Sequence, residues 1–152
     1  MGRPIIVKLP EPVKEFIERI REIGFTDGEA NYPEMYELVE DLRKNPNARV
    51  VVPYMFEFFE ANFDKVVGNP GPFVHFIEEV NDYHKLLKSS VRRKPTDLTL
   101  WMVNRILNVT TDRHEREEWL GLLRGAITNP SADPDAREAA NDFLQGQNER
   151  AT

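Results

Sequence analysis

GNPGPFVHFIEEVNDYHKLLKSSVRRKPTDLTLWMVNRILN, residues 68–108, is the stretch of the chain that decides its fold. It predicts two helices joined by a basic turn, one from Pro72 to about Ser90 and one that begins after Thr96. Apolar residues recur every three or four positions in the first helix and surround the second almost completely. A helix that is apolar on nearly all sides is normally buried, so we expect the second helix at the centre of the protein.

The same periodicity predicts five further helices. Four begin near residues 12, 33, 112 and 133, and one lies within residues 48–63, where it either starts at Pro53 or is kinked there. Helix starts near 33, 72 and 112 are 39 and 40 residues apart, close to the period of HEAT and armadillo repeats. We therefore predict an all-α fold of about seven helices, stacked as antiparallel helical hairpins in an α-solenoid. An irregular seven-helix bundle is the alternative.

The length of 152 residues corresponds to one domain with a sizeable core. We expect residues 1–10 to form an extension before the first helix and residues 146–152 to form a frayed tail. Cysteine is absent, which excludes disulfides and thiolate metal sites. No apolar run approaches the ~18 residues of a membrane span, and no secretory signal is visible. A cytoplasmic protein without membrane association is expected.

No motif for catalysis or cofactor binding is visible in the sequence. A nucleophile elbow, a P-loop and a dinucleotide fingerprint are all missing. His75 and His84 fall nine residues apart on one predicted helix, so their side chains point to opposite faces and cannot share a metal ion. His84 lies on the apolar stripe, where we expect a packing role. We predict neither an enzyme nor a metal or cofactor site.

The net charge of −6 is unevenly distributed along the chain. Residues 1–83 contain 16 acids and 9 bases, whereas residues 85–94 contain five bases and no acid. Basic residues at the end of a helix interact favourably with the negative pole of the helix dipole. This interaction explains the basic run 85–94 without any need for a bound ligand. An acidic body repels a phosphate backbone and attracts a basic partner, so we do not expect nucleic acid binding.

Six carboxylates on two consecutive predicted helices are candidates for a negative binding patch. They are Glu37, Glu40 and Asp41 on the second helix and Glu57, Glu60 and Asp64 on the third. Such a patch would be complementary to a cationic protein, and an ordinary solvated helix face is the alternative.

Three polar residues lie together toward the end of the central predicted helix. Asn104 and Asn108 are one turn apart, and Arg105 lies between them. Their side chains can hydrogen-bond to loop backbones or to a partner, so they are also candidate binding residues.

Two parts of residues 68–108 resemble small all-helical immunity proteins of bacterial polymorphic-toxin systems. They are GNPGPFVHFIEE at 68–79 and RRKPTDLTLWMVNRILN at 92–108. The resemblance implies a HEAT-like, non-enzymatic, cytoplasmic antidote. Such a protein would bind the toxic domain of a bacterial toxin and block its active site. Many of these toxins are nucleases with basic substrate grooves, which an acidic protein would fit.

Other functions remain open on the sequence alone. A general helical-repeat adaptor would bind several partners with modest affinity. A nucleic-acid-binding helical-repeat protein would extend the basic run 85–94 with Arg105 and Arg124 into one surface. A subunit of a homo-oligomer would use exposed aromatic residues.

Overall fold

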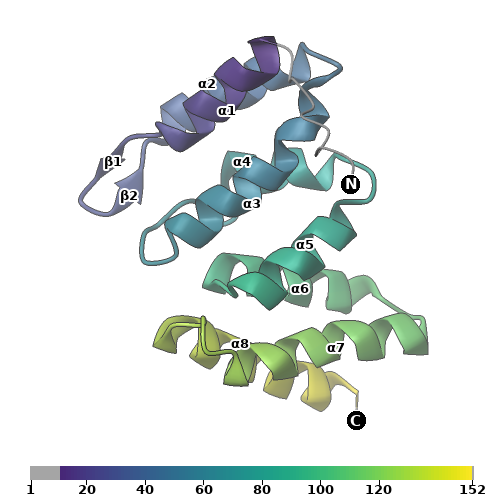
Figure 1. Ribbon diagram of the computed structural model, residues 1–152. Coiled ribbons are helices and arrows are strands. Elements are labelled where there is room, and N and C mark those ends of the chain that lie inside the picture. Colours follow the sequence, from purple (N-terminus) through teal and green to yellow (C-terminus); the bar gives the residue numbers. More distant parts are fainter. Residues whose placement is uncertain (1–10, 152) are drawn as a thin grey trace, which may run out of the picture.

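The computed structural model describes residues 11–151, which form eight α-helices, one 3₁₀ helix (η1) and a two-stranded hairpin (Figure 1). In chain order these are α1 (Glu11–Arg21), β1 (Phe25–Thr26), β2 (Glu29–Ala30), α2 (Tyr32–Arg43), η1 (Ala48–Val51), α3 (Val52–Ala61), α4 (Gly71–Glu78), α5 (Tyr83–Arg93), α6 (Asp97–Val109), α7 (Arg113–Thr128) and α8 (Pro134–Arg150). The predicted all-α class is confirmed. The expected extension at residues 1–10 lies outside the described residues. No helix within 11–151 is long and apolar enough to cross a membrane.

The helices follow one another in tiers, from α1 and α2 at one end of the molecule to α7 and α8 at the other (Figure 1). Along one side α1 contacts α3, α3 contacts α5 and α5 contacts α7, while α2 contacts α4 and α6 contacts α8. Neighbours in sequence also pack together, as α1 with α2, α5 with α6 and α7 with α8. The HEAT-like stack of hairpins stays a prediction, with which this order of contacts is compatible.

The helix expected from Pro72 to about Ser90 is wrong as a single element, because it divides into α4 and α5. Asp82 has a φ of 65°, in the left-handed region, which a continuing right-handed helix cannot contain. Ile77 on α4 and Leu87 on α5 are both fully buried. The apolar stripe therefore continues through the break, and periodicity alone could not reveal it.

The expected burial of the central helix is confirmed. Seven of the 13 residues of α6 are buried, and the helix contacts α5, α7 and α8. Its start is fixed by Thr96, whose Oγ1 accepts a hydrogen bond from Thr99 N at 3.1 Å in a capping box. The helix is thus held at its first turn and covered on most of its circumference.

The loop between α1 and α2 contains a feature that the sequence analysis did not predict. Strands β1 and β2 pair there as a short hairpin, with Asp27 and Gly28 at positive φ in its turn. Val66, from the loop after α3, extends this pairing: its N donates to Gly28 O and its O accepts from Ala30 N, both at 2.8 Å. The loop after α3 is therefore fixed against the hairpin.

The expected frayed tail is wrong as far as residue 150, because α8 continues to Arg150. The reason is Gln147, which is only 2% exposed and donates from Nε2 to Oδ1 of Asn104 and of Asn108, each at 2.8 Å. These hydrogen bonds hold the last turns of α8 against α6.

We expect Gln147→Ala to lower the free energy of unfolding by about 1–2 kcal/mol, because two partly buried hydrogen bonds are lost. Gln145→Ala is the matched control, since Gln145 is exposed on the same helix and its replacement should change stability by less than about 0.5 kcal/mol. Urea unfolding followed by circular dichroism measures both. Equal stabilities of the two variants would contradict the role given to Gln147.

Candidate functional site

Glu60, one of the six candidate carboxylates, is engaged within the molecule. Its side chain is 12% exposed and accepts hydrogen bonds from Arg93 Nε at 2.7 Å, Arg93 Nη2 at 2.6 Å and Ser90 Oγ at 2.8 Å. The bond to Glu60 is the main reason why the pKa of Arg93 is raised. Glu60 therefore joins α3 to α5, and little of it remains for a partner.

Four of the other candidate carboxylates also lie against a basic side chain. The pairs are Glu40–Arg43, Asp41–Arg19, Glu57–Arg21 and Asp64–Lys65, with N–O distances from 2.9 to 3.4 Å. The second and third pairs connect α1 to α2 and to α3. Only Glu37 has no ion pair within the described residues. In residues 11–151 the six carboxylates therefore do not form one unpaired negative surface.

The three polar candidates on α6 are also in intramolecular contacts. Asn104 and Asn108 accept from Gln147, and Arg150 Nη1 donates to Asn108 as well. Arg105 Nε lies 3.4 Å from Glu78 Oε2, and its guanidinium lies 5.4 Å from the centroid of the Trp101 ring. The structure thus gives these side chains a role in joining helices.

The basic run 85–94 is largely used in the same way. Lys88 Nζ lies 2.7 Å from Glu118 Oε1, and Arg93 binds Glu60. Lys94 Nζ donates to Ser131 O at 2.6 Å and lies 3.8 Å from the centroid of the Phe63 ring. Three of the five cations are therefore directed at neighbouring elements, which leaves no continuous free basic stripe along α5.

His84 packs against neighbouring aromatic rings, as expected, although it lies outside the core. Its side chain is exposed, and its ring lies edge-on to Trp119 with centroids 5.3 Å apart. Partial burial, and then the nearby charge of Lys88, lower its pKa. No three histidine, cysteine or carboxylate side chains come together as metal ligands anywhere in residues 11–151.

One group of unpaired carboxylates lies at the hairpin and at the start of α2, in a part of the chain without bases. Residues 22–42 contain seven acids and no basic residue. Glu40 and Asp41 are paired as described. The remaining five have no ion pair within the described chain, and we call them the acidic hairpin cluster: Glu22, Asp27, Glu29, Glu34 and Glu37. The run without bases was visible in the sequence, but the pairing that separates these acids from the others was not.

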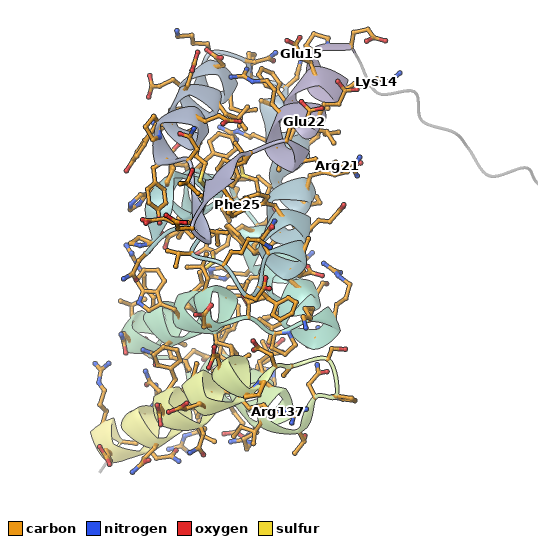
Figure 2. All side chains as sticks on the ribbon, turned by 90° about the vertical axis from the view of Figure 1, so that its left-hand side faces the viewer. Lys14, Glu15, Arg21, Glu22, Phe25 and Arg137 are labelled. Atoms are coloured by element: carbon orange, nitrogen blue, oxygen red, sulfur yellow. The ribbon has the colours of Figure 1, made fainter. Side chains whose placement is uncertain are left out.

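A groove of about 360 Å³ lies next to the hairpin, where the loop after α3 meets α6 and α8. Its apolar lining includes Val66, Leu98, Trp101 and Phe143. Val66 is 52% exposed. Figure 2 views the molecule from the side of the hairpin, with Phe25 near the centre and Arg137, in the first turn of α8, below it.

Asp97 gives the groove a carboxylate. Its Oδ1 accepts from Leu98 N at 2.8 Å, at the first turn of α6. Burial raises the pKa of Asp97, and the charges of Asp133 and Asp135 raise it further. Lys65 also lines the groove, but its Nζ is 3.4 Å from Asp64. The groove therefore combines an exposed valine and two partly buried aromatic side chains with a carboxylate in a negative environment.

The comparisons with known proteins do not assign this site. No family model, no curated protein and no solved structure matches the chain. The resemblance to immunity proteins consequently stays a prediction, and the function has to be argued from the chemistry of the surface.

We expect Glu60→Ala to lower the free energy of unfolding by about 1–3 kcal/mol, because it removes hydrogen bonds to a charged group and leaves Arg93 without its partner. Glu37→Ala removes the same side chain from a position without an ion pair, and its effect should stay within about 0.5 kcal/mol. Chemical denaturation of both variants tests this. An equal effect would mean that the Glu60 pair is no stronger than an ordinary surface contact.

Asp97 predicts a pH effect whose sign follows from its raised pKa. The ionised carboxylate is less favourable in the folded than in the unfolded protein, so stability is lost as the pH rises above the ordinary value of 3.8 and through the folded pKa. Asp97→Asn keeps an oxygen for Leu98 N. The quantity to compare is the free energy of unfolding of the variant minus that of the natural protein, measured by urea unfolding. This difference should be more positive at pH 7 than at pH 4. A larger relative loss at pH 7 would contradict the assignment.

Proposed function

We propose that the protein is non-enzymatic and acts by binding another protein, most specifically as an immunity protein that occludes a bacterial toxin. The observation that carries the proposal is the acidic hairpin cluster, in which five carboxylates have no ion pair in the described chain, whereas both carboxylates of α3 and the two others on α2, Glu40 and Asp41, do. This contrast supports a surface whose cationic partner is another molecule.

The physical argument rests on the cost of unpaired like charges. Carboxylates grouped within residues 22–37 repel one another, and this repulsion disfavours the compact state of the free protein. A cationic protein surface placed against them removes the repulsion and adds favourable interactions. Complementary charge also steers diffusional encounter, which raises the association rate. Fast capture suits an antidote that must bind its toxin before the toxin acts.

The resemblance of residues 68–108 to immunity proteins supports the identity of the partner class. A nuclease toxin has a basic groove for its substrate, and an acidic protein seated on that groove would exclude the substrate by steric and electrostatic means. No catalytic residue of the antidote is needed for this mechanism. A phosphate backbone, in contrast, would be repelled by the same cluster.

Capture from the native organism at low salt, followed by mass spectrometry and an activity assay, tests the proposal. We expect one dominant partner, a toxic domain of a larger secreted protein, whose activity is abolished by an equimolar amount of this protein. Several housekeeping partners of modest affinity would favour a general adaptor. Co-purified nucleic acid, or a partner whose activity is unchanged by binding, would also overturn the proposal.

Charge-neutralising variants give a quantitative prediction once the partner is in hand. Asp27→Asn combined with Glu29→Gln should slow association at low salt by about three- to tenfold, because steering is weakened, and should reduce its salt dependence. The Asp27 change suits the turn, since asparagine tolerates positive φ.

The matched control is Glu15→Gln combined with Glu18→Gln on α1, which changes the net charge by the same amount at a different place. Its association rate should stay within about twofold of the natural protein. Stopped-flow or surface-based kinetics measures both variants over a range of salt concentrations. An equal slowing by both pairs would mean that net charge, and not the hairpin, governs association.

A further inference from the structure

At one edge of the groove, an exposed apolar side chain lies next to the acidic hairpin. Val66 is 52% exposed, and its backbone pairs with that of Glu29, an exposed residue of the acidic hairpin cluster. The hydrogen bonds of Val66 to Gly28 and Ala30 fix this position. An apolar contact and a negative charge are therefore presented side by side on a backbone that is held in place.

The opposite edge of the groove repeats this combination. Trp101 and Phe143 are only partly buried and pack against the core from α6 and α8. Asp97 lies among them, and the charges of Asp133 and Asp135 act on it from the start of α8. Negative groups thus flank the apolar wall on two sides.

We infer that this groove is the docking site for an apolar side chain flanked by lysine or arginine residues on the surface of a partner protein. The inference rests on the proposed function and adds the contact surface to it. A volume of about 360 Å³ lies within the range of about 300–1,000 Å³ found for binding pockets, and it suits one or two large side chains. The apolar residue would be buried against Val66, Trp101 and Phe143, and its cationic neighbours would meet carboxylates on either side.

Charge decides between this occupant and the alternatives. A second copy of the chain would bring a net charge of −6 to a negative surface, and a phosphate group would meet the same repulsion. Lys65, the one lysine or arginine that lines the groove within the described residues, has its Nζ near Asp64 and 5.5 Å from the centroid of the Phe25 ring. It therefore does not reverse the sign of the site.

A fluorescence titration tests the groove without knowledge of the natural partner. The chain has two tryptophans, so Trp119→Phe leaves Trp101, in the groove, as the only one. The probe is the synthetic peptide Lys-Lys-Ala-Phe-Leu-Lys-Lys, and its matched control carries glutamine in place of each lysine. We expect a saturable change in Trp101 emission with the lysine peptide and binding at least about tenfold weaker with the glutamine peptide. Titration calorimetry of the natural protein with both peptides gives the same comparison if the variant does not fold.

Two valines of nearly equal exposure provide the matched variants. Val66→Lys places a cation in the groove, whereas Val50→Lys places it on η1, where the valine is 53% exposed compared with 52% for Val66. The first should weaken binding of the lysine peptide by about tenfold and the second by less than about twofold. No saturable binding, equal affinity for the two peptides, or equal effects of the two valine changes would overturn the inference.

The same variants separate this inference from the proposed function. If a captured toxin binds Val66→Lys as tightly as Val50→Lys, the groove is not its docking site, although the proposed function stands. If capture yields no inhibited toxin, the proposed function fails, and the peptide titration still decides whether the groove accepts a cation-flanked apolar side chain. If Val66→Lys loses toxin binding and Val50→Lys keeps it, the result supports both the proposed function and the docking site.

Discussion

The structure depends most on the burial of α6. This helix has apolar side chains on most of its circumference, among them Leu100, Val103 and Leu107, and each is nearly inaccessible to solvent. Burial of a large aliphatic side chain stabilises a protein by roughly 1.5–3 kcal/mol, so leaving any side of α6 uncovered would be costly. The contacts of α6 with α5, α7 and α8 meet this requirement. They also determine what remains accessible: the first turns of α6, with Asp97 and Trp101, line the groove.

Ion pairs between helices determine which charges of the surface are available to a partner. Arg93 of α5 holds Glu60 of α3, and Arg19 of α1 holds Asp41 of α2, so carboxylates that look free in the sequence are used to join neighbouring helices. The more exposed pairs, such as Arg21–Glu57, contribute little stability individually, but they neutralise the surface where they occur. The hairpin has no base within residues 22–42 and stays negative. Its free charge therefore follows from the absence of arginine and lysine within residues 22–42 as much as from the presence of acids.

Local signals in the sequence predicted the helices well, because these signals act over one turn. Thr96, Asp112 and Asp133 cap α6, α7 and α8 as their residue types indicated, each accepting a hydrogen bond from a backbone N three residues later. The break at Asp82 was not predictable, because the apolar stripe on either side of it is continuous. The ordered end of α8 was missed for another reason, since it depends on hydrogen bonds of Gln147 to residues 39 and 43 positions away.

The candidate site was harder to predict than the fold, because its parts come from distant segments. Lys65, Asp97 and Phe143 meet in one groove only after the loop that follows α3 has packed against α6 and α8. The predicted carboxylates were reasonable by composition, but the partners of Glu60 and Glu57 lie 33 and 36 residues away in sequence. Residue spacing carries no information on such pairs. The run of acids near the hairpin was the part of the surface that the sequence alone could have located.

Charge and apolar surface have different roles in the proposed recognition, and neither is sufficient alone. Exposed carboxylates such as Asp27 and Glu29 mainly accelerate encounter with a cationic partner. They add little to the stability of the complex, because salt screens the interactions of exposed charges beyond about 8–10 Å. Residence time depends on contacts that exclude water, which Val66, Trp101 and Phe143 can supply at roughly 25 cal/mol for each Å² of apolar area buried. Because the two kinds of residue adjoin one another, a partner steered to the hairpin arrives beside the surface that can retain it. This adjacency is set by the backbone pairing of Val66 with the hairpin, and therefore by the fold.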